Sequence, residues 1–227
     1  MKILAIDTSG KTASVALTED GRLLWEKTVY TKLTHSQVIL PMVTQAMTEC
    51  GLEYKNLDCI AAARGPGSYT GLRIGIGALK GLCMGEPSLR AAGVSTLLGL
   101  AYNCVGQQGR IVSVMRARPN IVYSAQFESV GMSVKRLTED KVCTEEEAFA
   151  DLGEDRIVLV GDCAEELKEK RFGDDPKVLC AARTMLLQRA SSLCMAVENE
   201  PQLMCSADEL EVSYLQATKA EKDKAHR

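Results

Sequence analysis

The residues with the clearest chemical signal lie between positions 63 and 75, where the sequence reads Ala-Arg-Gly-Pro-Gly-Ser-Tyr-Thr-Gly-Leu-Arg-Ile-Gly. An apolar run precedes this segment and helical spacing of apolar residues follows it, which predicts a strand, a tight turn and a helix. Such glycines serve a positive φ, close packing of the helix, or a ligand that approaches bare backbone. The last alternative predicts an anion site at the helix N-terminus, formed by Gly65, Pro66, Gly67, Ser68, Thr70, Gly71 and Arg73. Because the segment matches neither a Walker loop nor a Rossmann fingerprint, packing and anion binding both stay open.

A second candidate is the triplet Asp7, Thr8 and Ser9, which follows the first apolar run of the chain. Short polar side chains make turns by bonding to nearby backbone, and this structural role is sufficient to explain them. The functional alternative is a loop that holds phosphate, with the carboxylate placing a metal ion.

The histidines and cysteines do not form a recognisable site. The chain has two histidines, His35 and His226, and nine cysteines without a C-x-x-C pair. An odd number of thiols, mostly within apolar runs, predicts free, reduced cysteines. Ser68 does not lie in a G-x-S-x-G elbow, and nothing brings the one plausible base, His35, near it. We therefore predict no catalytic residue and no metal ligand in this chain.

Composition narrows the classes of protein further. With 227 residues, 46% hydrophobic and 25% charged, the chain is predicted to form one large or two small globular domains. A net charge of −3 provides no general positive field for nucleic acid. No apolar stretch is long enough to cross a membrane, and Asp7 interrupts the region that a signal peptide keeps apolar. We expect a cytoplasmic protein without membrane contact, which carries either a small basic patch or a solvated charged face at Arg116, Arg118, Lys135 and Arg136.

The apolar spacing predicts the same order of elements twice. A meander of strands at 2–6, 13–18 and 23–29 precedes a helix that starts at a capping box, Thr34 with Gln37, and ends at Gly51. Within that helix, Pro41 predicts either a separate first turn or a kink. The remaining elements are a strand at 59–63, helices at 70–84 and 96–105, strands at 111–114, 121–127, 133–137, 157–160 and 177–180, and helices at 144–152, from 164, and at 182–196.

Two such units side by side are the plan of the actin-like, Hsp70-like ATPase superfold, an α/β architecture built from two ribonuclease-H-like units. We predict units at 1–108 and 109–218, the second one degenerate, and a charged, disordered tail at 219–227. In this superfold an acid after the first strand helps to place metal and phosphate. By this analogy, Asp7, Thr8 and Ser9 are the remnant of a phosphate loop.

The second unit lacks the matching half of a nucleotide clamp. Arg116 stands where its first hairpin would carry an acid, and only Gly161 follows the strand at 157–160. We therefore predict that this chain requires no cofactor and is not a competent ATPase. Nucleotide would bind only weakly or at a subunit interface.

Several segments resemble one family. Residues 65–75 resemble the signature G-P-G-S-[FY]-T-G-[LI]-R-[IV]-G of the TsaB, or YeaZ, family, the small subunit of the bacterial machinery that makes threonylcarbamoyladenosine in tRNA. The resemblance extends to residues 3–9, 35–42, 93–97, 213–215 and 220–221, and is loose between about 110 and 205. Three positions depart from the family: Arg116 and Ile121 replace acids, and Gln216 replaces an arginine.

The resemblance implies a non-catalytic dimerisation subunit that supports a TsaD-like homologue in transferring threonylcarbamoyl to the tRNA adenosine next to the anticodon. It also implies a TsaE-like ATPase and, through the complex, tRNA as partners, with a homodimer when the chain is alone. The two metal-binding histidines of TsaD-like relatives correspond here to Thr96 and Leu100. Pairing would use the helices at 34–49 and 70–84 and these residues: His35, Val38, Ile39, Leu40, Met42, Ile74, Ala78 and Met84.

One alternative belongs to another class of protein. A stand-alone, kinase-like enzyme that binds nucleotide or phosphate would use Asp7, Ser9 and the turn at 65–71. It requires a second phosphate loop, which the sequence does not show. Peptidase activity is not expected, because Ser68 lacks a base.

Overall fold

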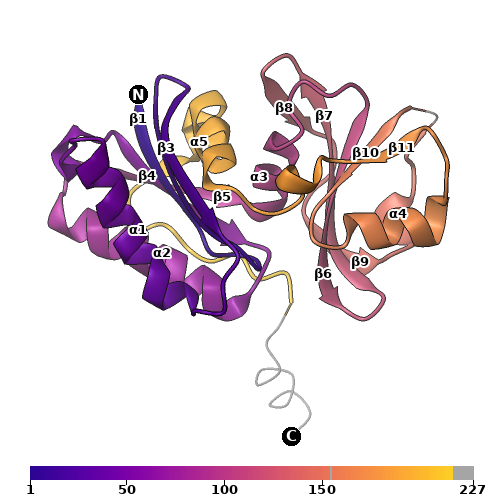
Figure 1. Ribbon diagram of the computed structural model, residues 1–227, viewed down its shortest axis with the longest axis horizontal. Helices are drawn as coiled ribbons and strands as arrows, with labels where there is room; N and C mark the ends of the chain where they lie inside the picture. The colour runs from indigo at the N-terminus through magenta and orange to yellow at the C-terminus, as the bar shows by residue number, and fades with distance from the viewer. Residues whose placement is uncertain (154, 217–227) are drawn as a thin grey trace, which may run out of the picture.

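The computed structural model describes residues 1–153 and 155–216, which form two sheets with helices between and outside them (Figure 1). The first sheet has the strand order β12-β5-β4-β1-β2-β3. Its meander is antiparallel, and β4 and β5 extend it in parallel from β1, while β12 closes the edge antiparallel to β5. The bounds are β1 (Lys2–Asp7), β2 (Ala13–Glu19), β3 (Arg22–Val29), β4 (Cys59–Gly65), β5 (Arg90–Ser95) and β12 (Met204–Cys205).

Helices cover both faces of this sheet. Because side chains alternate along β1, Leu4 and Ile6 pack under α1 (His35–Glu49) and α2 (Tyr69–Gly85), while Ile3 and Ala5 pack against α3 (Thr96–Tyr102) and α5 (Ala190–Asn199). The apolar cluster that contains Ile3 and Ala5 continues into the second sheet, so α3 and α5 lie in the core between the two units (Figure 1).

The second sheet repeats the topology of the first. Its order is β11-β10-β6-β7-β8, with β9 paired to β7. Again an antiparallel meander is extended by two parallel strands, β10 beside β6 and β11 beside β10. The duplicated α/β plan is that of the actin-like ATPase fold, as predicted. The bounds are β6 (Arg110–Arg118), β7 (Ile121–Val130), β8 (Ser133–Arg136), β9 (Lys141–Thr144), β10 (Ile157–Val160), β11 (Val178–Cys180) and α4 (Ala164–Phe172).

The second unit is reduced, and three predicted helices are wrong in extent. Thr144 and Glu147 do make the reciprocal bonds of a capping box, but only a 3-10 turn at Glu147–Phe149 follows. Backbone with positive φ at Asp151 and Gly153 then turns the chain away. The helix predicted at 182–196 begins only at Ala190, after a 3-10 turn at Arg183–Met185. The joining helix also ends early, at Tyr102 rather than 105.

The predicted division into two units needs one correction, which concerns the residues from 190 onward. Residues 190–216 were expected in the second unit, but α5 packs on β1 and β2, and β12 pairs with β5 of the first sheet. The reason is the buried stripe of α5, Ala190, Leu193 and Val197, which completes the apolar face of the first sheet. Residues 217–227, which include the predicted tail, lie outside the described residues.

Local predictions for the first helix are resolved by the structure. The Thr34 and Gln37 capping box is present, and Gly51 follows the helix with a φ of +64°. The helix runs through Pro41 without a separate first turn, so the carbonyl of Gln37 lacks its usual intrahelical donor.

All nine cysteines are free, six of them buried, as predicted. Within the described part of the chain, no helix has the length and apolarity to span a bilayer.

Candidate functional site

The glycines of the 65–71 turn pack against the loop between β1 and β2. A Cβ atom on Gly71 would lie 2.0 Å from the carbonyl oxygen of Thr8, and one on Gly67 would lie 2.4 Å from the carbonyl oxygen of Ser9. One turn later in α2, a Cβ atom on Gly75 would lie 2.5 Å from Thr8 Oγ1. Bare backbone is therefore needed to bring the start of α2 onto this loop.

Hydrogen bonds within the turn occupy some of the amides that an anion could use. Ser68 N–H donates to the carbonyl of Ser9 at 2.8 Å, Gly71 N–H donates to Ser68 Oγ at 3.2 Å, and Leu72 N–H donates to the carbonyl of Ser68 at 2.8 Å. Of the two open interpretations of the motif, the geometry favours close packing over an anion site.

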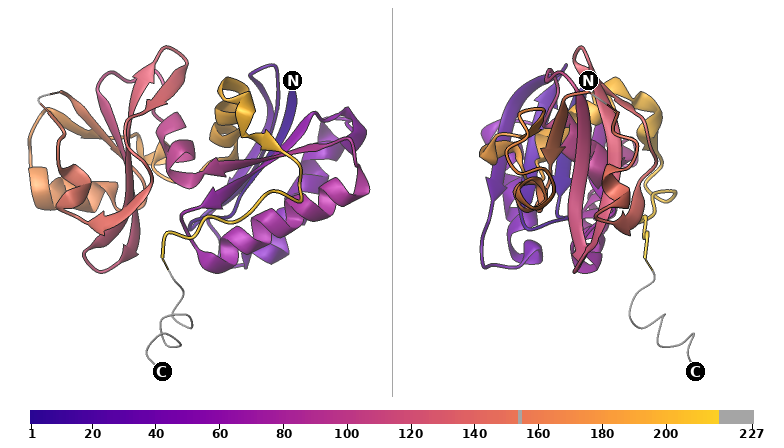
Figure 2. Two further views of the ribbon diagram at one scale, coloured as in Figure 1. Left: turned by 180° about the vertical axis from the view of Figure 1, so that it is seen from behind. Right: turned by 90° about the vertical axis from the view of Figure 1, so that its right-hand side faces the viewer.

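The C-terminal segment, residues 206–216, runs alongside α2 and closes the turn from the outside (Figure 2). Ser213 N–H donates to the carbonyl of Arg64 at 2.7 Å, and a Cβ atom on Gly65 would lie 2.3 Å from the carbonyl oxygen of Ser213. The Tyr214 ring stacks on Tyr69 with 4.8 Å between centroids.

Arg73 is part of the same contact. Its Nε donates to the hydroxyl of Tyr214 at 2.9 Å, and its guanidinium lies 4.1 Å from the ring centroid of Tyr69. Arg73 was predicted to assist in binding an anion. The structure instead places it as a link between α2 and the C-terminal segment.

Asp7 lies buried at the end of β1. Ser9 donates to its Oδ1 from both the backbone N–H, at 2.9 Å, and Oγ, at 2.6 Å. Burial raises the pKa of Asp7 to about 6, and the bonds from Ser9 counteract part of this rise. Thr8 Oγ1 donates to the carbonyl of Gly71 at 2.7 Å. The triplet Asp7, Thr8 and Ser9 therefore ties the loop to α2.

His35 lies at the start of α1, above the same loop. Its Nε2 lies 3.1 Å from the carbonyl oxygen of Thr12, and hydrogen bonding to that oxygen makes this nitrogen the donor. In this state Nε2 holds a proton and does not act as a base. Ser68 in turn accepts the Gly71 N–H as the N-cap of α2.

The space beside the β1–β2 loop is filled by the protein itself. Gln188, 2% exposed, lies so close to Gly10 that a Cβ atom there would be 2.2 Å from Gln188 Oε1. Thr12 Oγ1 donates to the carbonyl of Gln188 at 3.0 Å, and Lys11 Nζ lies 3.5 Å from Asp162 Oδ2 in the second unit. The actin-like fold implies a nucleotide phosphate at this loop, but the residues present do not fit one. This geometry counts against the kinase-like alternative.

Arg116, which replaces an acid of the family, belongs to an ion-pair network around the buried Glu145. Its guanidinium donates to Glu145 Oε1 at 2.6 Å and to Glu166 Oε1 at 2.7 Å, and its backbone N–H donates to Asp162 Oδ1 at 2.8 Å. Lys170 also donates to Glu145, which lowers the pKa of Glu145 to about 2, with Arg116 as the next cause. Arg116 is thus engaged inside the second unit.

The predicted basic patch is correspondingly smaller. Like Arg116, Arg136 is paired, with its NH1 2.5 Å from Asp140 Oδ1. Arg118 and Lys135 are exposed. Two of the four cations that were expected to share a surface are therefore committed to carboxylates of the same chain.

The positions that correspond to metal-binding histidines lie in the core. Thr96 and Leu100 are buried on α3, where a hydroxyl and an aliphatic side chain offer no imidazole ligand. Thr96 Oγ1 has no hydrogen-bond partner among the described residues. Across residues 1–153 and 155–216, no group of three or more histidine, cysteine or acidic side chains is arranged to hold a metal.

The predicted interface residues separate into three groups. Leu40 and Met84 are 48% and 84% exposed, and His35, Val38, Ile74 and Ala78 are half-buried. Ile39 and Met42 lie on the inner face of α1, buried in the chain's own core, so their predicted role at a partner interface is wrong. They belong to the inward stripe of the helix and cannot reach another chain.

Sequence reasoning missed other exposed groups next to this face. Tyr30 and Leu33, in the loop before α1, are 73% and 56% exposed, and a groove of about 270 Å³ lies between that loop and Pro41. Gly77 and Gly81 of α2 face open space, with no described atom within 4 Å of an added Cβ. The signal for the glycines was their four-residue spacing, which puts both on one helix face.

Comparison with known proteins agrees with these features. The sequence model of the family described as tRNA N6-adenosine threonylcarbamoyltransferase matches residues 30–209. The tRNA threonylcarbamoyladenosine biosynthesis protein TsaB of Escherichia coli is 40% identical over 130 residues, 56% of this chain and 55% of that protein. Its namesake in Haemophilus influenzae is 33% identical over 174 residues, 71% of this chain and 72% of that protein.

A solved structure of YeaZ from Pseudomonas aeruginosa superposes with a TM-score of 0.81 at 27% identity, covering 94% of this chain and 99% of that one. The aligned part of the E. coli relative is only about half of its length. The family model, by contrast, spans most of this chain, and the H. influenzae alignment spans more than two thirds of both proteins. The chain belongs to the TsaB (YeaZ) family.

Proposed function

We propose that this chain is a non-catalytic subunit in the synthesis of threonylcarbamoyladenosine in tRNA, acting in the cytoplasm. Its partner is a larger threonylcarbamoyltransferase of the TsaD type, which supplies the metal and acyl-donor site. A TsaE-like ATPase and tRNA join through that complex. The names of the relatives and of the matching family model support the process, and the geometry of this chain supports the role within it.

The observation that carries the proposal is the outer face of α1 and α2, which lie side by side on the first sheet (Figure 1). Gly77 and Gly81 point into open space from the middle of α2. A glycine in a helix interior costs about 1 kcal/mol relative to alanine. No neighbour within the described chain requires that cost, whereas a partner helix packed close to the backbone does.

Apolar side chains flank this glycine stripe. Leu40 and Met84 are exposed, and Ile74 and Ala78 are half-buried on the adjacent surface of α2. Apolar groups around a flat helical surface are typical of a protein–protein interface. Without the larger partner, the same face closes on a second copy as a two-fold homodimer.

The remainder of the chain favours a structural role over a catalytic one. The positions for metal ligands hold Thr96 and Leu100 in the core, and Gln188 occupies the space beside the phosphate-loop remnant. The contribution to threonylcarbamoyl transfer is then to hold the larger subunit in its active form. No cofactor is required by this chain, and any nucleotide in the complex lies against the partner.

The test is light scattering after size exclusion, with the chain alone and mixed with the TsaD-type protein of the same organism. We expect a homodimer that converts to a heterocomplex. Leu40→Glu should abolish the heterocomplex at micromolar concentration, because it places a charge in an apolar contact. Met132→Glu is the matched control, since Met132 is also exposed but lies in the second unit.

Two results would overturn the proposal. No complex with the wild-type chain would refute the subunit role, and a complex unaffected by Leu40→Glu would refute the α1–α2 face. In either case, calorimetric titration with ATP and Mg²⁺ would test the kinase-like alternative, for which tight binding is required.

A further inference from the structure

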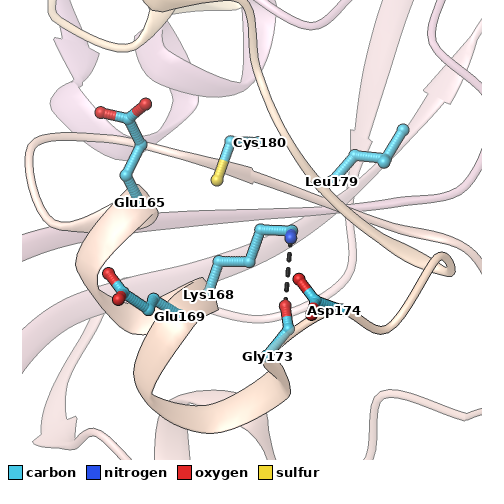
Figure 3. Close-up of a pocket in the computed structure, with 7 residues that line it drawn as sticks. All are labelled: Glu165, Lys168, Glu169, Gly173, Asp174, Leu179 and Cys180. Carbon is cyan, nitrogen blue, oxygen red and sulfur yellow. Dashed lines mark hydrogen bonds between the residues drawn. The ribbon is translucent and has the colours of Figure 1, made fainter.

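A groove of about 660 Å³ lies between α4 and β11, in the second unit, away from the α1–α2 face (Figures 1 and 3). Helix α4 contributes Glu165, Lys168 and Glu169, and β11 contributes Leu179 and Cys180. Figure 3 shows Asp174 at the end of the helix, on the same rim as the Lys168 ammonium. The groove thus has the strand β11 on one side and the charged side chains of α4 on the other.

One wall of the groove is the free edge of a sheet. Strand β11 pairs with β10 alone, and the bonds to β10 involve the backbone of Lys177 and Ala181, at 2.9 and 2.8 Å. Because a parallel strand turns alternate residues to opposite edges, the backbone groups of Val178 and Cys180 face outward. The Val178 N–H donates to the carbonyl of Asp175 at 3.1 Å. The Cys180 N–H and both carbonyls have no hydrogen-bond partner in the described chain.

The rim is acidic. Glu165 and Glu169 lie one helical turn apart, and Asp174 adds a third carboxylate, against the ammonium of Lys168 and the guanidinium of Arg183, which pairs with Glu165. That ammonium donates to the carbonyl of Gly173 at 3.2 Å (Figure 3). Neither Glu169 nor Asp174 pairs with a cation in the described part of the chain.

One internal contact shows the type of group that this rim accepts. Arg183 Nε donates to Glu165 Oε1 at 2.9 Å, with the two side chains 88% and 53% exposed. An exposed ion pair contributes little to stability and exchanges readily. A guanidinium or ammonium from another chain can therefore take the place of Arg183.

We propose that the α4–β11 groove binds an extended, lysine- or arginine-bearing segment of a partner protein, which adds to the edge of β11 as a strand. The backbone of the segment pairs with the carbonyl of Val178 and with the N–H and carbonyl of Cys180, and every second side chain points toward Glu165, Glu169 and Asp174. The side chains at the intervening positions point to the opposite face and cover Leu179. This inference is independent of the proposed function, because it concerns a different unit and different residues.

The probe is a capped octapeptide of alternating lysine and valine, titrated into the full chain and followed by calorimetry and by amide shifts of residues 178–180. We expect saturable binding with shifts confined to β11 and α4. The double substitution Glu165→Lys with Glu169→Lys should weaken binding about tenfold, since two exposed charge pairs are reversed. Glu128→Lys, at an exposed position of β7, is the control for net charge, and circular dichroism verifies the fold of each variant.

Two further peptides separate a strand from simple charge attraction. The same octapeptide with N-methyl groups on alternate amides keeps its charge but cannot pair with β11, so it should lose binding. Equal binding of the methylated peptide, or equal competition by spermine, would overturn the proposal in favour of a diffuse cation site. Equal weakening by Glu128→Lys would overturn it as well.

Discussion

Helix α2 carries two sets of glycines that face opposite ways. At its start, Gly71 and Gly75 meet the backbone and side chain of Thr8 at distances that leave no room for a methyl group. In its second half, Gly77 and Gly81 meet nothing within 4 Å. Contacts within the chain explain the first set of glycines. No contact among the described residues explains the second set, and we propose that a partner does.

The largest expected effect is at the glycines that contact Thr8, namely Gly71 and Gly75. Gly71→Ala would place a methyl group 2.0 Å from the carbonyl oxygen of Thr8, and this backbone atom cannot move away without breaking the β1–β2 loop. We expect a loss of about 3 kcal/mol or more in the free energy of unfolding, measured by urea denaturation. A loss below about 1 kcal/mol would contradict close packing as the reason for this glycine.

The next effect concerns the loop that the inward glycines contact. The pKa of Asp7 is raised by burial to about 6 from an ordinary 3.8, so the folded protein holds this proton more tightly than the unfolded chain. Unfolding between these values releases the proton, and the free energy of unfolding therefore falls as pH rises from about 4 to 6. The expected penalty is roughly 2–3 kcal/mol above pH 6.

Asp7→Asn isolates this effect, since the amide oxygen can still accept the bonds from Ser9. The measurement is urea denaturation of both proteins between pH 4 and 7. The difference in unfolding free energy, variant minus wild type, should rise with pH and level off near pH 6. A difference that is flat, or that falls, would show that Asp7 is not a buried, destabilised carboxylate.

The role of Gly77 and Gly81 is tested by placing a large side chain at one of these positions. Gly81→Leu should leave the isolated chain folded, because no described atom lies near the added side chain. It should weaken the complex with the TsaD-type partner by about 10- to 100-fold, through a steric clash at close-packed helices. Sedimentation velocity over a concentration series provides the affinity, and undiminished affinity would move the interface away from α2.

These tests also mark what the sequence could predict. The buried residues of α1 are Ile39, Met42, Val43, Ala46 and Met47, which recur at helical spacing, and assigning Ile39 and Met42 to a partner contradicted that pattern. The strand–turn–helix order and the duplicated topology followed from periodicity and turn residues, which are local signals. The family resemblance supplied what periodicity could not, namely the process in which the chain takes part.

The features that escaped prediction join distant parts of the chain. Gln188 fills the space at Gly10 across 178 positions, Ser213 packs on Gly65, and α5 returns to the first sheet. No local pattern encodes such contacts, because they depend on how the two units dock. The short second-unit helix is a different failure: a correct capping box at Thr144 was followed by too little helical sequence to continue.

The smallest expected effect has the opposite sign to the largest. Gly77→Ala lies in the same helix as Gly71→Ala and adds the same methyl group, but into open space. Alanine restricts the unfolded chain and favours the helix, so the isolated protein should gain about 0.5–1 kcal/mol in unfolding free energy. Affinity for the partner should fall several-fold, because the added Cβ atom separates two backbones in contact. A variant that is more stable alone and weaker in the complex is the outcome that only an external partner explains; a gain in stability without loss of affinity would leave the glycine stripe outside the interface.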